Sequence, residues 1–115
     1  IGEWHVGEPP HKGTRRLLKQ KGISTEGITA RQITAADFER FEYIVTMDQE
    51  NLAYMERERG EAGTAKVRLL MTYVKDPRIK EVPDPYYTGD FNETYELIEA
   101  GCRALLDHIR RHYNV

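Results

Sequence analysis

Two short apolar segments, separated by a helix-forming stretch, are the feature that most constrains how this chain folds. The first, residues 43–47 (YIVTM), is compact and β-branched, which is typical of a buried strand. Asp48 follows it directly and can cap a helix over residues 49–60. Residues 66–70 form a second strand candidate, although so short an apolar run can also be helical. A strand, a helix and a strand in this order predict a parallel pair joined by a crossover helix, and hence an α/β fold.

Further helices are predicted on both sides of this pair. Residues 14–21 form a short helix, residues 34–37 begin another, and residues 91–113 form a long amphipathic helix with Asp90 as its N-cap. Residues 75–89 are rich in Asp and Pro and are predicted to be a loop.

The predicted sheet is too small for the helices around it. A parallel sheet is normally covered on both faces, and a typical sheet has about 5–6 strands. Two strands with at least three helices therefore indicate an incomplete architecture. We expect residues 1–115 to form one partial domain, a parallel sheet flanked by helices from which further strands are missing. The open strand edges predict marginal stability, a homodimer or strand exchange.

Composition excludes several classes of protein. The 115 residues carry a net charge of −2, which gives no electrostatic footprint for nucleic acid or an anionic membrane. One cysteine allows no internal disulfide. No apolar run approaches the ~18 residues that a membrane span needs, and the first residues do not resemble a signal peptide. We expect a cytoplasmic protein.

The most informative loop segment is residues 83–87 (PDPYY). Pro85 biases Asp84 toward extended backbone, so Asp84 is held in a stiffened loop. Tyr86 and Tyr87 beside it offer flat, amphipathic surface. The pattern fits a catalytic carboxylate next to an aromatic wall, but these five residues by themselves are more typical of an ordinary surface turn.

Two other residues have both a structural and a functional interpretation. Trp4 lies in a Gly- and Pro-rich loop, where it is either a packing anchor or a wall of a ligand pocket. Asp48 follows a predicted strand, at the sheet edge where α/β folds bind ligands. It can equally serve as a helix N-cap, and one residue can do both.

The cysteine and two histidines of the last predicted helix are interpreted as structural. Cys102 falls on its apolar face, where a buried thiol is inert. His108 and His112 have the i, i+4 spacing of metal ligands. They lack a carboxylate between them and lie at a helix C-terminus, where cations are favoured by the dipole. We expect no metal site.

Several segments, in order along the chain, together resemble the low-molecular-weight protein-tyrosine phosphatases, and bacterial members in particular. The segments are Trp4-His-Val-Gly-Glu-Pro-Pro10, Ala30-Arg-Gln-Ile33, Asp37-Phe38, Tyr43-Ile-Val-Thr-Met-Asp48 with Asn51, Asp84-Pro-Tyr-Tyr87 followed by Thr-Gly, and Cys102-Arg-Ala-Leu-Leu106. The similarity covers essentially the whole chain.

The resemblance implies a four-stranded parallel sheet and a catalytic Cys-x5-Arg loop between the first strand and the first helix. The cysteine thiolate attacks phosphorus, and an aspartate protonates the leaving phenolate and then activates water. No cofactor or metal takes part. The expected substrates are phosphotyrosine proteins or small aryl phosphates.

Roles in this chemistry carry over to six residues of this chain. By the resemblance, Asp84 is the general acid, Tyr86 and Tyr87 line the cleft for the phosphotyrosine ring, Trp4 forms the opposing wall, and Arg31 and Asp48 support the cleft.

The nucleophile has no counterpart in these residues. The chain contains no Cys-x5-Arg sequence, and the sixth residue after Cys102 is His108. Relative to the family, the first strand, the catalytic loop, the first helix and the second strand are expected to be absent. The 115 residues alone are therefore predicted to be inactive.

Two other functions remain open. The same scaffold serves phosphoarginine phosphatases and arsenate reductases. Tyr86 and Tyr87 suit a flat aryl phosphate better, and arsenate reduction needs further thiols. A non-catalytic interaction module is the other alternative, although such a module would not need Asp84.

Overall fold

The computed structural model describes residues 5–76 and 78–115. The chain divides into two units, Ile1–Thr34 and Ala35–Val115, and each is described by itself. In the described residues, no helix combines the length and the apolar character needed to cross a membrane.

Between residues 5 and 34, the described part of the first unit, there is one helix, α1 (Lys12–Gln20), close to its predicted position. The ring Nδ1 of His11 caps it by accepting a hydrogen bond from the Gly13 amide at 3.0 Å. Two backbone hydrogen bonds join the segment before α1 to residue 30: the Gly7 amide donates to the Ala30 carbonyl at 2.8 Å, and the Ala30 amide donates to the Glu8 carbonyl at 2.9 Å.

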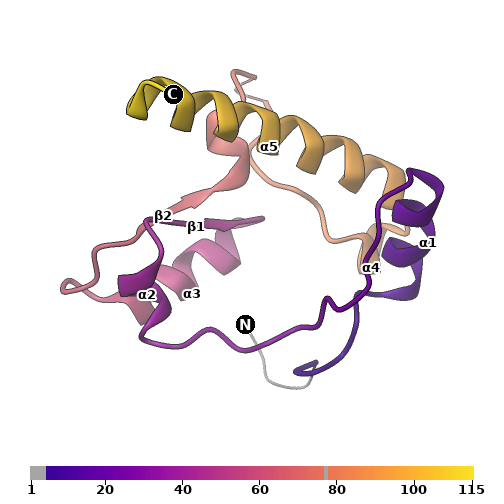
Figure 1. The fold of residues 1–115 in the computed structure, drawn as a ribbon, viewed down its shortest axis with the longest axis horizontal. Helices are drawn as coiled ribbons and strands as arrows, with labels where there is room; N and C mark the ends of the chain where they lie inside the picture. Colours follow the sequence, from indigo (N-terminus) through magenta and orange to yellow (C-terminus); the bar gives the residue numbers. More distant parts are fainter. Residues whose placement is uncertain (1–4, 77) are drawn as a thin grey trace. The chain divides into compact units, whose positions relative to one another are not determined.

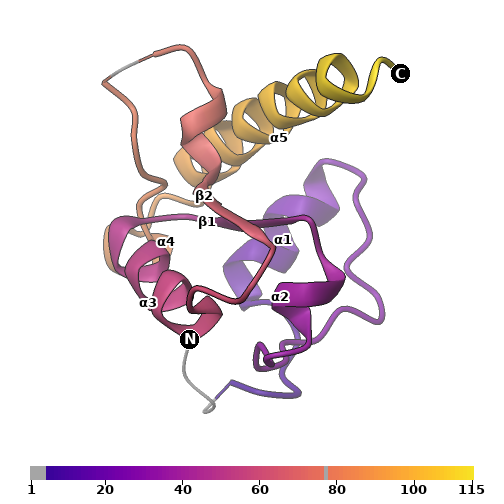
Figure 2. The same cartoon turned by 90° about the vertical axis from the view of Figure 1, so that its left-hand side faces the viewer.

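The second unit is built on the predicted strand–helix–strand unit. Its elements, in chain order, are α2 (Asp37–Arg40), β1 (Tyr43–Thr46), α3 (Gln49–Arg59), β2 (Lys66–Leu69), the 3₁₀ helix η1 (Leu70–Tyr73), α4 (Pro85–Thr88) and α5 (Phe91–Tyr113). The strands are parallel, with Tyr43 opposite Lys66 and Thr46 opposite Leu69. Helix α3 lies on one side of the strands and α5 on the other, where α5 packs against η1 (Figure 1, Figure 2).

The second strand candidate is a strand, and its burial shows why. Val67 and Leu69 are buried while Arg68 between them is exposed, so the side chains alternate with the period of two that a strand produces. Leu70 is also buried, but it already belongs to η1. The run of apolar residues thus ends in a turn that directs the chain toward α5.

Two sequence predictions are wrong. Residues 75–89 are not all loop, because residues 85–88 form the one-turn helix α4. Cys102 is exposed rather than buried. The buried residue of α5 is its neighbour Gly101, which faces Leu70 of η1. Successive helical residues differ by about 100° in direction, so Cys102 points away from that contact.

Candidate functional site

The sequence Asp-Pro-Tyr-Tyr-Thr-Gly folds into a one-turn helix that Asp84 begins. The Asp84 Oδ1 atom accepts a hydrogen bond from the Tyr86 amide at 2.9 Å, which is an N-cap. Pro85 at the first helical position has the backbone φ that a helix requires and no amide to leave unpaired. Gly89 ends the turn in the left-handed region, with φ of 72°.

The Asp84 carboxylate faces solvent. One oxygen is engaged by the Tyr86 amide, and among the described residues no hydrogen bond to the other oxygen, Oδ2, is found. The backbone carbonyl of Asp84 also accepts the Tyr87 amide at 3.0 Å. The residue is therefore fixed by its backbone and by one carboxylate oxygen.

The two tyrosines beside Asp84 form an exposed aromatic surface. The Tyr86 side chain is 75% exposed and that of Tyr87 is 81% exposed. Their ring centroids lie 5.2 Å apart with the planes at 85°, an edge-to-face pair.

The loop before Asp84 is tied to three elements of the second unit. The Val82 amide donates to the Met47 carbonyl, at the end of β1, at 2.8 Å. The Glu81 Oε2 atom accepts from the amide of Gln49, the first residue of α3, at 2.7 Å. The Thr94 hydroxyl of α5 donates to the Pro83 carbonyl at 3.3 Å. These bonds tie the loop that leads to Asp84 to the carboxyl end of β1, the sheet edge where α/β folds bind ligands.

Asp48 is an N-cap in this structure. Its Oδ1 atom accepts a hydrogen bond from the Asn51 amide at 2.8 Å, and the side chain is half-buried. The residue lies between Met47 and Gln49, the two residues that bind the loop carrying Asp84. The structure thus brings Asp48, Asp84, Tyr86 and Tyr87 into one unit.

The other two predicted site residues belong to the first unit. Trp4 lies outside the described residues. Arg31 is exposed, and its guanidinium Nη1 donates to the Gln32 carbonyl at 3.3 Å. It directly follows Ala30, whose backbone is bonded to residues 7 and 8.

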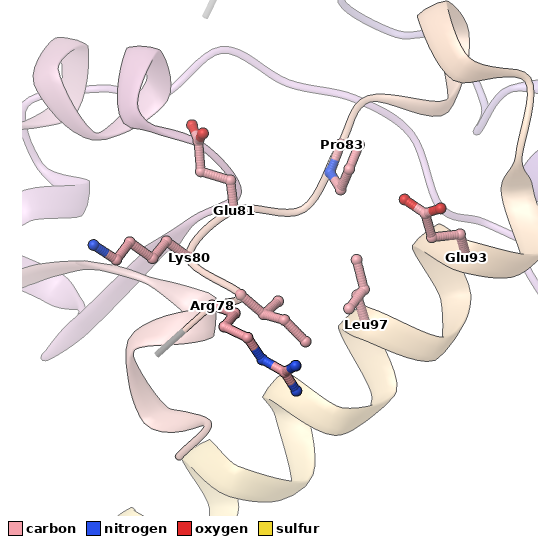
Figure 3. A pocket seen from close by; sticks show the side chains of 7 residues that line it. Arg78, Lys80, Glu81, Pro83, Glu93 and Leu97 are labelled. Atoms are coloured by element: carbon pink, nitrogen blue, oxygen red, sulfur yellow. The ribbon is translucent and has the colours of Figure 1, made fainter. Parts of the chain in front are cut away.

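An open hollow of about 560 Å³ lies beside the loop that leads to Asp84 (Figure 3). Its lining residues are Arg78, Ile79, Lys80, Glu81, Pro83, Glu93 and Leu97. The Arg78 guanidinium is engaged by the Asp76 carboxylate through two hydrogen bonds of 3.1 Å. These bonds lower the pKa of Asp76. The charges of this hollow are mixed and its arginine is already paired, so it does not form an anion site.

The described residues contain no group of three His, Cys, Asp or Glu side chains that could hold a metal ion. The His108 and His112 rings are stacked, with centroids 6.1 Å apart and planes at 8°.

The comparison with known proteins identifies the family. The profile described as "Low molecular weight phosphotyrosine protein phosphatase" matches residues 1–115. The chain belongs to this family. It is 44% identical over 111 residues to the low molecular weight protein-tyrosine-phosphatase YfkJ of Bacillus subtilis. The aligned residues cover 96% of this chain and 71% of YfkJ. It is also 33% identical over 114 residues to PtpA of Staphylococcus aureus strain Newman. That alignment covers 99% of this chain and 71% of PtpA.

Solved structures of relatives share the fold. The crystal structure of YfkJ matches with a TM-score of 0.92 and 44% identity over 97% of this chain and 70% of that chain. The structure described as DARP, drosophila arginine phosphatase, matches with a TM-score of 0.83 and 34% identity over 93% of this chain and 71% of that chain. The predicted α/β fold of the low molecular weight phosphatase family is thereby confirmed.

Two residues of this phosphatase chain that hold the loop were missed in the sequence. Glu81 bonds to a residue 32 positions earlier, and Thr94 bonds to one 11 positions earlier. Their types carry no signal, because a glutamate in a proline-rich loop and a threonine in the first turn of a helix are both common. A helix-capping motif can be recognised from residues at most four positions apart. The bonds of Glu81 and Thr94 instead depend on how the loop crosses the edge of the sheet.

Proposed function

We propose that this chain supplies the general acid and part of the substrate cleft of a phosphatase that hydrolyses phosphotyrosine through a phosphocysteine intermediate. The observation that carries the proposal is the placement of Asp84. The chain belongs to this family, and its Asp84 carboxylate faces solvent. One oxygen of that carboxylate is held by a backbone amide, and two exposed tyrosines lie next to it in the sequence.

In the proposed reaction, Asp84 acts twice. While the cysteine thiolate forms the P–S bond and the P–O bond to the tyrosine breaks, protonated Asp84 gives its proton to the leaving phenolate oxygen. In the second step the Asp84 carboxylate takes a proton from water as the water oxygen attacks phosphorus and the P–S bond breaks. The thiolate and the carboxylic acid are then restored, and no cofactor is consumed.

The remaining site residues support this cleft in the proposal. Tyr86 and Tyr87 contact the phenyl ring of the substrate, and Trp4 forms the facing wall. Arg31 and Asp48 support the cleft from their own loops, Asp48 through its cap on α3. The nucleophile would come from a Cys-x5-Arg segment outside the 115 residues, because these contain none. The chain spans about 71% of YfkJ and of PtpA, which agrees with this reading.

A substitution of Asp84 tests the proposal in the product of the complete reading frame, called the full-length protein below. In Asp84→Asn, the amide oxygen can still accept the Tyr86 amide, so the turn is retained, but no proton can be given. We expect kcat/KM for phenyl phosphate to fall about 100- to 10,000-fold, the usual contribution of a general acid. With p-nitrophenyl phosphate the loss should be much smaller, because its leaving group is a weak base.

Asp90→Asn is the matched control. Asp90 caps α5 by accepting the Glu93 amide at 2.9 Å, and asparagine keeps that bond as well. This variant should retain the activity of the parent protein. An Asp84→Asn protein as active as the parent on phenyl phosphate would refute the assignment. A complete reading frame without a Cys-x5-Arg sequence would refute the catalytic proposal altogether.

Phosphoarginine is the second candidate substrate, and one observation favours it. The similar structure with a TM-score of 0.83 is described as an arginine phosphatase. The adjacent exposed rings of Tyr86 and Tyr87 favour the aryl phosphate. Comparing kcat/KM of the full-length protein on phosphotyrosine and phosphoarginine peptides decides between them, and we expect phosphotyrosine to be the better substrate.

A further inference from the structure

We propose that Glu81 is a positioning residue for Asp84, which it serves by fastening the loop that carries Asp84 to the first turn of α3. This inference rests on the proposed function of Asp84 as the general acid.

Glu81 lies outside α3 but accepts a hydrogen bond from a backbone amide in the first turn of that helix. The first four amides of a helix have no partner within it. Asp48 accepts one of them, from Asn51, and Glu81 accepts another, from Gln49, at 2.7 Å. A carboxylate at a helix N-terminus is favoured by the helix dipole, and its hydrogen bond to an amide is short and charge-assisted. In Figure 3 the Glu81 carboxylate points away from Leu97.

A second bond makes the attachment directional. Val82, the next residue, is 3% exposed and donates its amide to the Met47 carbonyl at 2.8 Å. Residues 81 and 82 thus bind on either side of Asp48, to Met47 and to Gln49. Two bonds at adjacent residues fix both the place and the direction of the chain, whereas the Val82 bond alone would let it pivot.

Little freedom remains between this attachment and the acid. Pro83 and Pro85 flank Asp84, and the ring of each proline fixes its own φ. The Pro83 carbonyl is held by the Thr94 hydroxyl. The two prolines therefore pass part of a pivot at residue 81 along the chain to Asp84, while the Thr94 bond limits its size.

A general acid acts only within about 2.6–3.2 Å of the oxygen it protonates. A displacement of about 1 Å can cost roughly 100-fold in rate. The Glu81 bond is exposed to water, which weakens it, so we expect a smaller effect than this limit.

The test uses Glu81→Ala and Glu81→Gln in the full-length protein, with phenyl phosphate and p-nitrophenyl phosphate as paired substrates. Glu81→Ala should lower kcat/KM for phenyl phosphate about tenfold, within the ~100-fold limit above, and that for p-nitrophenyl phosphate by less than about twofold. Glu81→Gln should recover much of the loss, because its amide oxygen still accepts the Gln49 amide. Glu96→Ala, which removes an exposed glutamate of α5, is the control and should change neither value.

Amide hydrogen exchange gives a readout without catalysis. The Gln49 amide should exchange faster in Glu81→Ala than in the parent protein, and the Asn51 amide, bound by Asp48, should not. Equal losses on both substrates, or unchanged Gln49 exchange, would overturn the positioning role while leaving Asp84 as the acid. Absence of turnover by the parent protein would instead overturn the proposed function, and the positioning role with it.

Discussion

At the scale of single residues, Asp48 caps the helix that follows it, and its two neighbours bind the loop of the candidate site. Its carboxylate caps α3, while the flanking Met47 and Gln49 bind the loop that leads to Asp84. The two interpretations drawn from the sequence, a cap and a residue at the binding edge of the sheet, are therefore compatible. The cap is confirmed, and a role in the cleft stays a proposal.

Substitutions at Asp48 separate these roles. Asp48→Ala leaves the Asn51 amide without its partner, and we expect a loss of about 1 kcal/mol in the free energy of unfolding, within the ~0.5–2 range for N-caps. Asp48→Asn keeps an accepting oxygen and should lose little. Urea denaturation of the full-length protein measures both. If Asn proved as destabilising as Ala, the charge of Asp48 and not its cap would be what stabilises α3.

At the scale of elements, local sequence signals predict the helices and strands well, whereas contacts between distant segments could not be predicted from the sequence. β1, the Asp48 cap and α3 follow from a β-branched run with an aspartate directly after it. Asp90, confirmed as the N-cap of α5, is read in the same local way. Cys102 was misplaced because the contact face of α5 is set by Gly101, a residue with no side chain to mark an apolar stripe. Glu81 was missed because its partner is 32 residues away.

The packing of α5 on η1 depends on that glycine. A Cβ atom at Gly101 would lie 2.6 Å from Leu70 Cγ and 2.9 Å from its Cδ2. Gly101→Ala should cost about 1–3 kcal/mol for overpacking and regain about 1 kcal/mol of helix propensity, so we expect a net destabilisation of up to about 2 kcal/mol. Thermal and chemical unfolding of the full-length protein measure this change.

The matched comparison is the same substitution in a Leu70→Ala background. With the clash removed, Gly101→Ala should stabilise by about 1 kcal/mol through helix propensity alone. A stabilising effect of similar size with Leu70 present would show that α5 and η1 move apart at no cost.

At the scale of the whole molecule, the chain carries the proposed general acid but no Cys-x5-Arg sequence to supply the proposed nucleophile. It belongs to a phosphatase family and spans about 71% of YfkJ, and it contains no Cys-x5-Arg sequence. In the described residues β1 and β2 pair only with each other. The predictions of a homodimer and of an interaction module both arise from this arrangement, and both remain predictions.

The isolated 115-residue chain should not turn over p-nitrophenyl phosphate. In the proposed reaction Asp84 assists bond breaking only while a nucleophile attacks phosphorus, and the chain has no Cys-x5-Arg loop to supply the attacking thiolate and bind the phosphoryl oxygens. Cys102 is exposed, but no arginine stands six residues after it, so Cys102→Ser should make no difference. The full-length protein, assayed alongside, is the positive control. Turnover by the isolated chain that disappears in Asp84→Asn would contradict this expectation and require a different nucleophile.

Calorimetric binding of phosphotyrosine without turnover by both the isolated chain and the full-length protein would favour the interaction module, since a catalytic protein must release phosphate when the nucleophile is present.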